Sequence, residues 1–108
     1  GWTIPPPIKM GGLLAQIIMK VKIEFYATFR EKYGKGLVIE SSHSLYDAMK
    51  AAARVLRGSF LKDIYDDKGN FRIDVMITVN GRNLLDMKHE VVLKEGDRIA
   101  IYPPVAGG

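Results

Sequence analysis

The stretch KEGDRIAIYPPVAGG, residues 94–108, combines a tight turn, a short strand and an ending that does not suit a packed fold. Residues 94–97 have turn composition, and the alternating RIAIY that follows predicts a strand with Ile99 and Ile101 directed inward. Pro103 and Pro104 should end this strand, because proline has no N–H to donate to a sheet. The remaining residues are small and have nothing to pack against, so we expect a flexible tail over 103–108 that projects into solvent.

Three more strands are predicted upstream. Residues 20–26 alternate, with Val21, Ile23 and Phe25 on one face and Lys22, Glu24 and Tyr26 on the other. A second short strand is predicted over 37–40, after a loop over 28–36. A third alternates Ile73, Val75, Ile77 and Val79 inward and ends at Asn80-Gly81, the strongest short hairpin signal in the chain. Leu84 and Leu85 should lie on the returning segment.

One helix is clear in the sequence. Apolar residues recur at helical spacing from Leu45 to Leu56, Ser44 can cap the start with Asp47 three residues on, and Gly58 is a suitable stop. Residues 59–70 are ambiguous: they allow a short helical turn followed by a turn cluster over 66–70. Because no second helix is evident, one helix should cover one face of a mixed sheet of four to five strands. This is an α+β layout that suits a β-grasp (ubiquitin-like) fold.

The first eighteen residues differ from the rest. They hold the run Pro5-Pro6-Pro7, which favours a polyproline conformation, a flexible Gly11-Gly12 pair and an apolar stretch too short to span a bilayer. Met19 is a plausible original start. We therefore expect residues 1–18 to be a poorly ordered extension or leader, or alternatively a functional amphipathic arm, and residues 19–108 to form the one domain.

Composition narrows the functional classes. The chain has 108 residues and no cysteine, which excludes disulfides, thiolate metal sites and catalytic thiols. The absence of cysteine is most simply explained by a cytoplasmic location, which we therefore expect. The formal charge of +4 favours acidic partner surfaces, but the basic residues are scattered and no run of them suggests a nucleic-acid track. His43 and His89 are isolated from metal-ligand spacing, so no metal is expected. No segment suggests membrane association.

The ending KEGDRIAIYPPVAGG resembles the C-terminal signature of the MoaD/ThiS family of ubiquitin-like sulfur carriers. VKIEFYATFRE near the start and VMITVNGRNL before the last hairpin resemble the family more weakly. The resemblance implies a sulfur carrier that is no enzyme on its own and forms the small subunit of molybdopterin synthase. Its partners would then be a MoaE-like large subunit and a MoeB-like activating enzyme, in a complex with two copies of each synthase subunit.

The tail suits this chemistry on physical grounds. A terminal carboxylate has a pKa of about 3.3–3.7, so at neutral pH it is ionised and a poor electrophile until it is activated, for example by ATP-dependent adenylation. Gly107 and Gly108 carry no side chain, so they can enter a narrow channel. The resemblance implies that the adenylate on Gly108 becomes a thiocarboxylate, which donates sulfur to the dithiolene of molybdopterin. ATP would be used by the activating enzyme, and the chain itself would bind no cofactor. Residues in the tail would be Pro103, Pro104, Val105, Ala106, Gly107 and Gly108.

A docking surface should accompany the tail. Tyr26 and Tyr102 are predicted on neighbouring strands with Leu84 nearby, and together they would form an aromatic-aliphatic patch for a partner. The alternative for each residue is ordinary half-buried sheet packing. Arg30 and Arg98 could pair with acidic groups of a partner or remain solvated.

Three other functions remain open from the sequence. The same activated tail would serve a ubiquitin-like modifier joined to lysines through Gly108, or a sulfur carrier of the thiamine pathway. A basic β-grasp module that contacts RNA would need no free tail at all, and its binding would be sensitive to salt.

Overall fold

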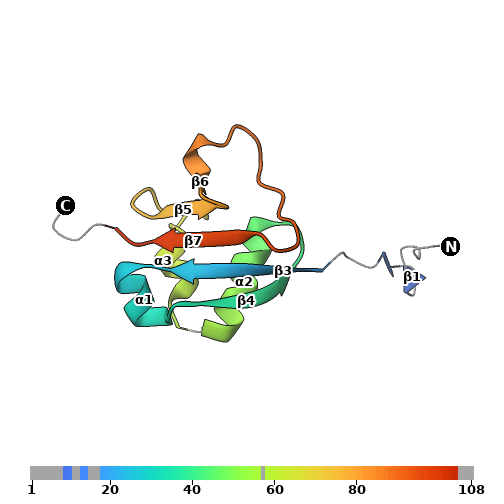
Figure 1. The fold of residues 1–108 in the computed structure, drawn as a ribbon, viewed down its shortest axis with the longest axis horizontal. Coiled ribbons are helices and arrows are strands. Elements are labelled where there is room, and N and C mark those ends of the chain that lie inside the picture. The colour runs from blue at the N-terminus through green and yellow to red at the C-terminus, as the bar shows by residue number, and fades with distance from the viewer. Residues whose placement is uncertain (1–8, 11–12, 15–17, 57, 105–108) are drawn as a thin grey trace.

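The computed structural model describes residues 9–10, 13–14, 18–56 and 58–104 of the chain. Its centre is a five-stranded mixed sheet with the order β4-β3-β7-β5-β6 (Figure 1). The central strands β3 and β7 run parallel, and every other neighbouring pair is antiparallel. The predicted mixed sheet is thereby confirmed. The strands are β3 (Met19–Phe25), β4 (Gly36–Ser41), β5 (Met76–Val79), β6 (Arg82–Asn83) and β7 (Arg98–Tyr102).

Helices cover one face of this sheet. The long helix α2 (Leu45–Leu56) and the short α3 (Phe60–Ile64) lie behind the strands in Figure 1, while α1 (Ala27–Tyr33) follows the end of β3. A 3-10 turn, η1 (Leu84–Asp86), follows β6. A mixed sheet wrapped around one main helix is the β-grasp arrangement, so the predicted fold class is confirmed.

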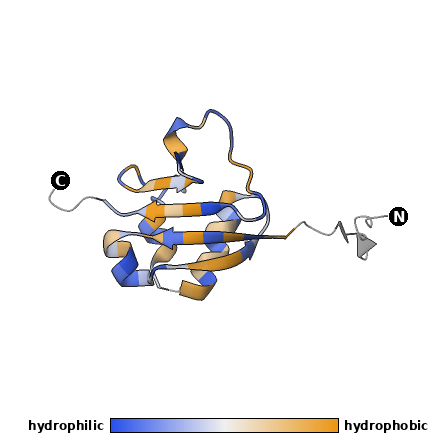
Figure 2. Cartoon of the chain, in the orientation of Figure 1, coloured by the Kyte–Doolittle hydropathy of each residue, from blue (hydrophilic) through white to orange (hydrophobic). Residues whose placement is uncertain are grey.

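The core lies between the sheet and α2. Hydropathy alternates along β3 and β7 in Figure 2, and the inward residues of these strands are almost fully buried. They meet Ala48, Met49 and Ala52 on one side of α2, with Phe60 and Ile64 of α3. The small alanines let the helix approach the sheet closely. The inward residues of the central strands are Val21, Ile23, Phe25, Ile99 and Ile101.

Two boundaries that the sequence predicts, the turn after β5 and the start of α2, are confirmed. Asn80 and Gly81 have φ values of 52° and 86°, the left-handed pair that a tight hairpin between β5 and β6 requires. At the start of α2, the Ser44 hydroxyl oxygen accepts a hydrogen bond from the Asp47 N–H at 3.3 Å. The Ser42 hydroxyl donates to the Asp47 carboxylate at 2.7 Å, which holds the first turn from a second side.

The segment expected to be a loop over 28–36 contains a helix, so that prediction is wrong. Helix α1 has only seven residues and buries one of them, Phe29, so it shows too few apolar positions for a helical period to stand out. Tertiary contacts stabilise it instead. Lys32 donates to the Asp63 carboxylate of α3 at 2.8 Å, and the Tyr33 hydroxyl donates to the same carboxylate.

Strand β5 is shorter than its alternation predicts. The pattern predicts a strand with Ile73 on the same face as Val75, but Ile73 is 98% exposed and the strand begins only at Met76. Arg72 and Asp74 form an ion pair across Ile73, and the Val75 N–H bonds the Arg72 carbonyl at 3.2 Å. This local turn directs the isoleucine into solvent, whereas Val75 remains buried.

Before β3, Lys9–Met10 (β1) and Leu13–Leu14 (β2) form a small antiparallel pair. The Pro5-Pro6-Pro7 run and the Gly11-Gly12 pair lie outside the described residues. The order of residues 1–18 therefore stays a prediction. None of the helices seen in the described parts of the chain has the length and apolar character needed to cross a bilayer.

Candidate functional site

The tail leaves the sheet at a point fixed by its two central strands. Because β3 and β7 are parallel, with Phe25 opposite Ile101, both end at the same edge, at the left of Figure 1. The Tyr26 N–H then donates to the Ile101 carbonyl at 3.3 Å. Strand pairing stops at Tyr102, and Pro103 and Pro104 follow outside the strand, as predicted.

Two tyrosines stack at this exit. The rings of Tyr26 and Tyr102 lie 4.6 Å apart between centroids with 10° between their planes, and both side chains are half-buried. Arg30 of α1 completes the arrangement, because its guanidinium carbon lies 5.1 Å from the Tyr26 ring centroid and its Nε donates to the Phe25 carbonyl at 3.0 Å. Tyr102, the last strand residue before the tail, thus stacks on a ring that Arg30 contacts in turn.

Glu24 links this stack to the outer face of the sheet. Its carboxylate accepts a hydrogen bond from the Tyr26 hydroxyl at 3.1 Å, and it lies 3.4 Å from Arg98 and 3.5 Å from Lys22. The hydrogen bond to Glu24 is the main cause that raises the pKa of Tyr26, so the phenol remains protonated at physiological pH. We call Glu24, Tyr26, Arg30 and Tyr102 the tail root.

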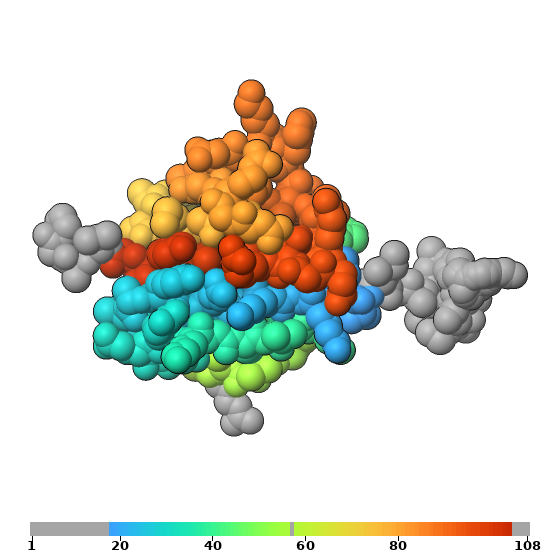
Figure 3. All heavy atoms as spheres, in the orientation of Figure 1, coloured from blue at the N-terminus to red at the C-terminus, as the bar shows by residue number. Residues whose placement is uncertain are grey.

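The outer face that surrounds the tail root presents both charged and apolar groups. Figure 3 views this face, with β7 in red beside β3 in blue. Tyr102 pairs with Met76 of β5, whose side chain is 41% exposed, while Ala100 is buried and gives a flat centre. A partner that binds this face would meet the exposed Met76 side chain beside Tyr102 and the ion pairs of Glu24.

The structure brings together two of the three residues predicted to form the docking patch. Tyr26 and Tyr102 are in contact, but Leu84 packs against the hydrophobic core, on the opposite face of the sheet from Tyr102. Leu84 is placed there because the return strand β6 ends at Asn83, whose side chain accepts the Leu85 N–H and starts the 3-10 turn. Its predicted place near the tyrosines is therefore wrong.

Two members of this site were not proposed from the sequence. Glu24 was placed on the outward side of its strand together with Tyr26, but no local pattern indicated that it would bond the tyrosine. Met76 alternates outward on β5, and only the pairing with β7 reveals its position beside Tyr102. Arg98, which could have paired with a partner, has its own partner in Glu24.

The structure describes two of the predicted tail residues, Pro103 and Pro104. Pro103 is half-buried and Pro104 is exposed. Val105, Ala106, Gly107 and Gly108 lie outside the described residues, so their role stays a prediction. Within the described segments, no three histidine or carboxylate side chains gather in a way that could hold a metal ion.

The fold is that of a ubiquitin-like β-grasp protein. It has a mixed sheet, a single long helix, and a last strand whose final residue, Tyr102, stacks on Tyr26. Residues 23–108 match the model of the ThiS family, and the chain belongs to that family of ubiquitin-like sulfur carriers and modifiers. The match continues to Gly108, so it includes the tail.

Three similar proteins extend this assignment. Small archaeal modifier protein 3 from Haloferax volcanii is 28% identical over 94 residues, which cover 83% of this chain and the whole of that protein. The solution structure of small archaeal modifier protein 1 from Methanosarcina acetivorans has 26% identity and a TM-score of 0.69, and the match covers 85% of this chain and 99% of that one. A putative molybdopterin converting factor, subunit 1, from Pyrococcus furiosus has 29% identity and a TM-score of 0.55, with 81% and 99% covered.

Proposed function

We propose that this chain is a ubiquitin-like modifier that is attached to other proteins through Gly108. An activating enzyme would transfer AMP from ATP to the terminal carboxylate and release pyrophosphate. A lysine amine of the target would then attack the acyl carbon and displace AMP as the isopeptide bond forms. Where an enzyme thiol first displaces AMP to give a thioester, the lysine amine displaces that thiol instead. The chain supplies the acyl group and its partners supply the catalysis.

The observation that carries this proposal is the likeness to small archaeal modifier protein 3, which extends over that protein's full length. The tail root supports it. Conjugation requires a thin C-terminal segment that reaches into an enzyme while the domain docks outside, and here Tyr102, the last strand residue, is anchored by the Tyr26 stack. The exposed Met76 and the ion pairs of Glu24 lie beside the exit, where an activating enzyme would dock.

The first test is a search for conjugates in cells that express the chain with an N-terminal affinity tag. The last basic residue is Arg98, so trypsin would leave residues 99–108 as a branch on each modified lysine. Branched peptides of this mass support the proposal if they disappear when Gly108 is deleted. If free chain is recovered with no branch on any lysine, although a known modifier in the same cells gives conjugates, the proposal fails.

A second candidate function is sulfur donation to molybdopterin, with a MoaE-like subunit and a MoeB-like activating enzyme as partners. It is favoured by the likeness to the putative molybdopterin converting factor subunit from Pyrococcus furiosus. The adenylate would react with a sulfur donor to give a thiocarboxylate on Gly108 in place of an isopeptide bond. The test is restoration of molybdopterin synthesis in cells that lack their own small subunit. Failure there, with conjugates present, would leave the modifier function alone.

A further inference from the structure

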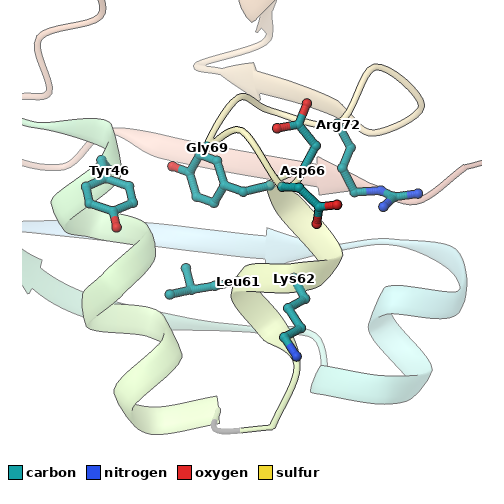
Figure 4. A pocket seen from close by; sticks show the side chains of 8 residues that line it. Tyr46, Leu61, Lys62, Asp66, Gly69 and Arg72 are labelled. Carbon is teal, nitrogen blue, oxygen red and sulfur yellow. The ribbon is translucent and has the colours of Figure 1, made fainter.

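Two adjoining hollows form a groove along the N-terminal part of α2, α3 and the segment that follows α3. Their volumes are about 560 and about 480 Å³, and they share Tyr46, Tyr65 and Gly69. In Figure 4, Tyr46 projects from α2 while Asp66 and Arg72 come from the segment after α3. The groove has no residue in common with the tail root, so the proposed activation of the tail does not explain it.

Aromatic rings line the middle of the groove. Tyr46 and Tyr65 meet edge to face with centroids 5.5 Å apart, and Tyr65 stacks on Phe71 at 4.7 Å. The Tyr46 side chain is 51% exposed, although it is a large aromatic group. Its ring already attracts a cation, because the Lys50 ammonium lies 5.0 Å from the ring centroid. The walls therefore suit a flat or extended group that carries positive charge.

The Tyr65 hydroxyl is not accessible from the groove. Its oxygen is buried, yet it has no hydrogen-bond partner among the described residues. Burial is also the main cause that raises the pKa of Tyr65. A buried hydroxyl without a partner destabilises a folded protein, and such groups are rare unless a ligand or water completes them. Because this oxygen has almost no accessible surface, an occupant of the groove would contact the Tyr65 ring and not its hydroxyl.

The charge of the groove is opposite to that of the whole chain. Asp66, Asp67 and Glu90 line it, and the described residues place none of the three in an ion pair. Arg72 also lines the groove, but both of its bonds go to the Asp74 carboxylate, at 3.2 Å each. Lys62 is the one remaining cation that lines the groove in the described part of the chain. A negative, aromatic groove on a chain of net charge +4 favours a cationic occupant.

We propose that this groove binds an arginine side chain presented by an extended segment of a partner protein. The planar guanidinium can stack on the exposed Tyr46 ring, and its several N–H donors can reach the carboxylates at the rim of the groove. The second hollow, which extends toward Val91, leaves room for the residues beside the arginine. This site would act as a second contact, separate from the tail and independent of its activation.

The experiment is an NMR titration of the ¹⁵N-labelled full chain with the acetylated, amidated peptide Gly-Gly-Arg-Gly-Gly. The matched control is the same peptide with citrulline, which keeps the shape and loses the charge. The expected result is saturable shifts of the Tyr46, Gly69 and Val91 amides, with weaker shifts or none for citrulline. A chain without Gly108 should bind equally well, so the outcome does not depend on the proposed function.

Two variants test the contacts. Tyr46→Leu removes the exposed ring and Asp67→Asn removes one rim charge, and each should weaken peptide binding by about two- to fivefold. Both side chains are exposed, so neither change should lower the melting temperature enough for a loss of binding to be attributed to unfolding. Lys20→Gln, on the outer face of the sheet, is the matched control and should bind normally.

Any one of several results would overturn the proposal. These are no saturable shift of Gly69 at peptide concentrations of about 10 mM, equal binding of the citrulline peptide, unchanged affinity of Tyr46→Leu, and shifts that map to the tail root. Shifts of the same amides that depend on protein concentration without peptide would assign the groove to a second copy of the chain and would also contradict it.

Discussion

Tyr26 and Tyr102 stack with their ring centroids 4.6 Å apart at the edge where the two central strands end. One ring follows the first strand of the domain and the other closes its last strand, so the contact joins residues 76 positions apart in the sequence. The Arg30 guanidinium carbon lies 5.1 Å from the Tyr26 ring centroid, and the Glu24 carboxylate accepts a hydrogen bond from the Tyr26 hydroxyl. The direction in which the tail starts is therefore set by the parallel pair of central strands and by one short helix.

Replacing Tyr26 with alanine should loosen the tail root without unfolding the domain. Tyr26→Ala removes the stack and the bond to Glu24, so the free energy of unfolding should fall by about 1 kcal/mol and adenylation of the tail should slow. Denaturant unfolding and an ATP-pyrophosphate exchange assay with the activating enzyme would measure the two effects. Tyr26→Phe keeps the stack and should retain most of the adenylation rate. Equal rates for the alanine variant and the unmodified chain would show that the stack does not position the tail.

Ala27 should gain stability when it becomes glycine. It begins α1 with a φ of 54°, in the left-handed region that costs an L-residue about 1–2 kcal/mol. Glycine avoids this cost, although it loses more conformational entropy on folding than alanine does. The net effect of Ala27→Gly should be to stabilise the protein by about 0.5–1 kcal/mol. Ala51→Gly, inside α2, is the control and should destabilise by about 1 kcal/mol. Thermal melts that rank both variants below the unmodified protein would argue against a strained start of α1.

The Asp63 carboxylate should make stability fall in acid. Burial alone would raise its pKa, but hydrogen bonds from the Lys32 ammonium and the Tyr33 hydroxyl outweigh burial and lower the pKa below the ordinary value of 3.8. A depressed pKa in the folded state stabilises the protein above the unfolded value, and this stabilisation is lost as pH falls through the folded value.

The corresponding measurement compares Asp63→Asn with the unmodified protein by urea unfolding at about pH 7 and at about pH 2.5. The variant should be less stable at the higher pH, and the difference should shrink at the lower one. A difference that stays constant across this range would mean that the charge of Asp63 does not hold α1 against α3.

Phe60 should be among the most costly residues to truncate. It is fully buried and meets Phe25 and Tyr33 edge to face, at 5.9 and 5.3 Å between centroids. Phe60→Ala should lower the free energy of unfolding by about 3–5 kcal/mol, a large share of the stability of a small domain. Val55→Ala, at a position 65% exposed on α2, should change it by less than about 0.5 kcal/mol. Similar losses for the two variants would contradict the assigned core.

The sequence predicted those elements whose signals are local. Asn80-Gly81 requires a turn whatever surrounds it, Ser44 and the apolar spacing from Leu45 define α2, and two prolines end β7. Helix α1 and the exposure of Ile73 could not be predicted, because each depends on a partner distant in sequence or on a side-chain pair. Asp63 stabilises α1 from another helix, and the Arg72–Asp74 ion pair shapes the turn that exposes Ile73.

The candidate site could also be predicted from the sequence only in part. The outward alternation of Glu24 and Tyr26 and the position of Tyr102 at the end of a strand are visible in the sequence, and parallel pairing of the two strands brings these residues together. Leu84 was misplaced, because a two-residue return strand followed by a 3-10 turn leaves its side chain on the core side. No local sequence pattern distinguishes a two-residue strand such as β6 from a strand of ordinary length.

The central claim, that Gly108 is the reactive end of the chain, is tested most directly by intact mass after incubation with ATP and the activating enzyme. Three forms are compared: the full chain, the chain without Gly108, and the chain with one alanine added after Gly108. With a lysine-bearing target or a sulfur donor present, we predict an isopeptide adduct or the exchange of one terminal oxygen for sulfur on the full chain alone. An adduct of equal yield on the extended chain would contradict the account.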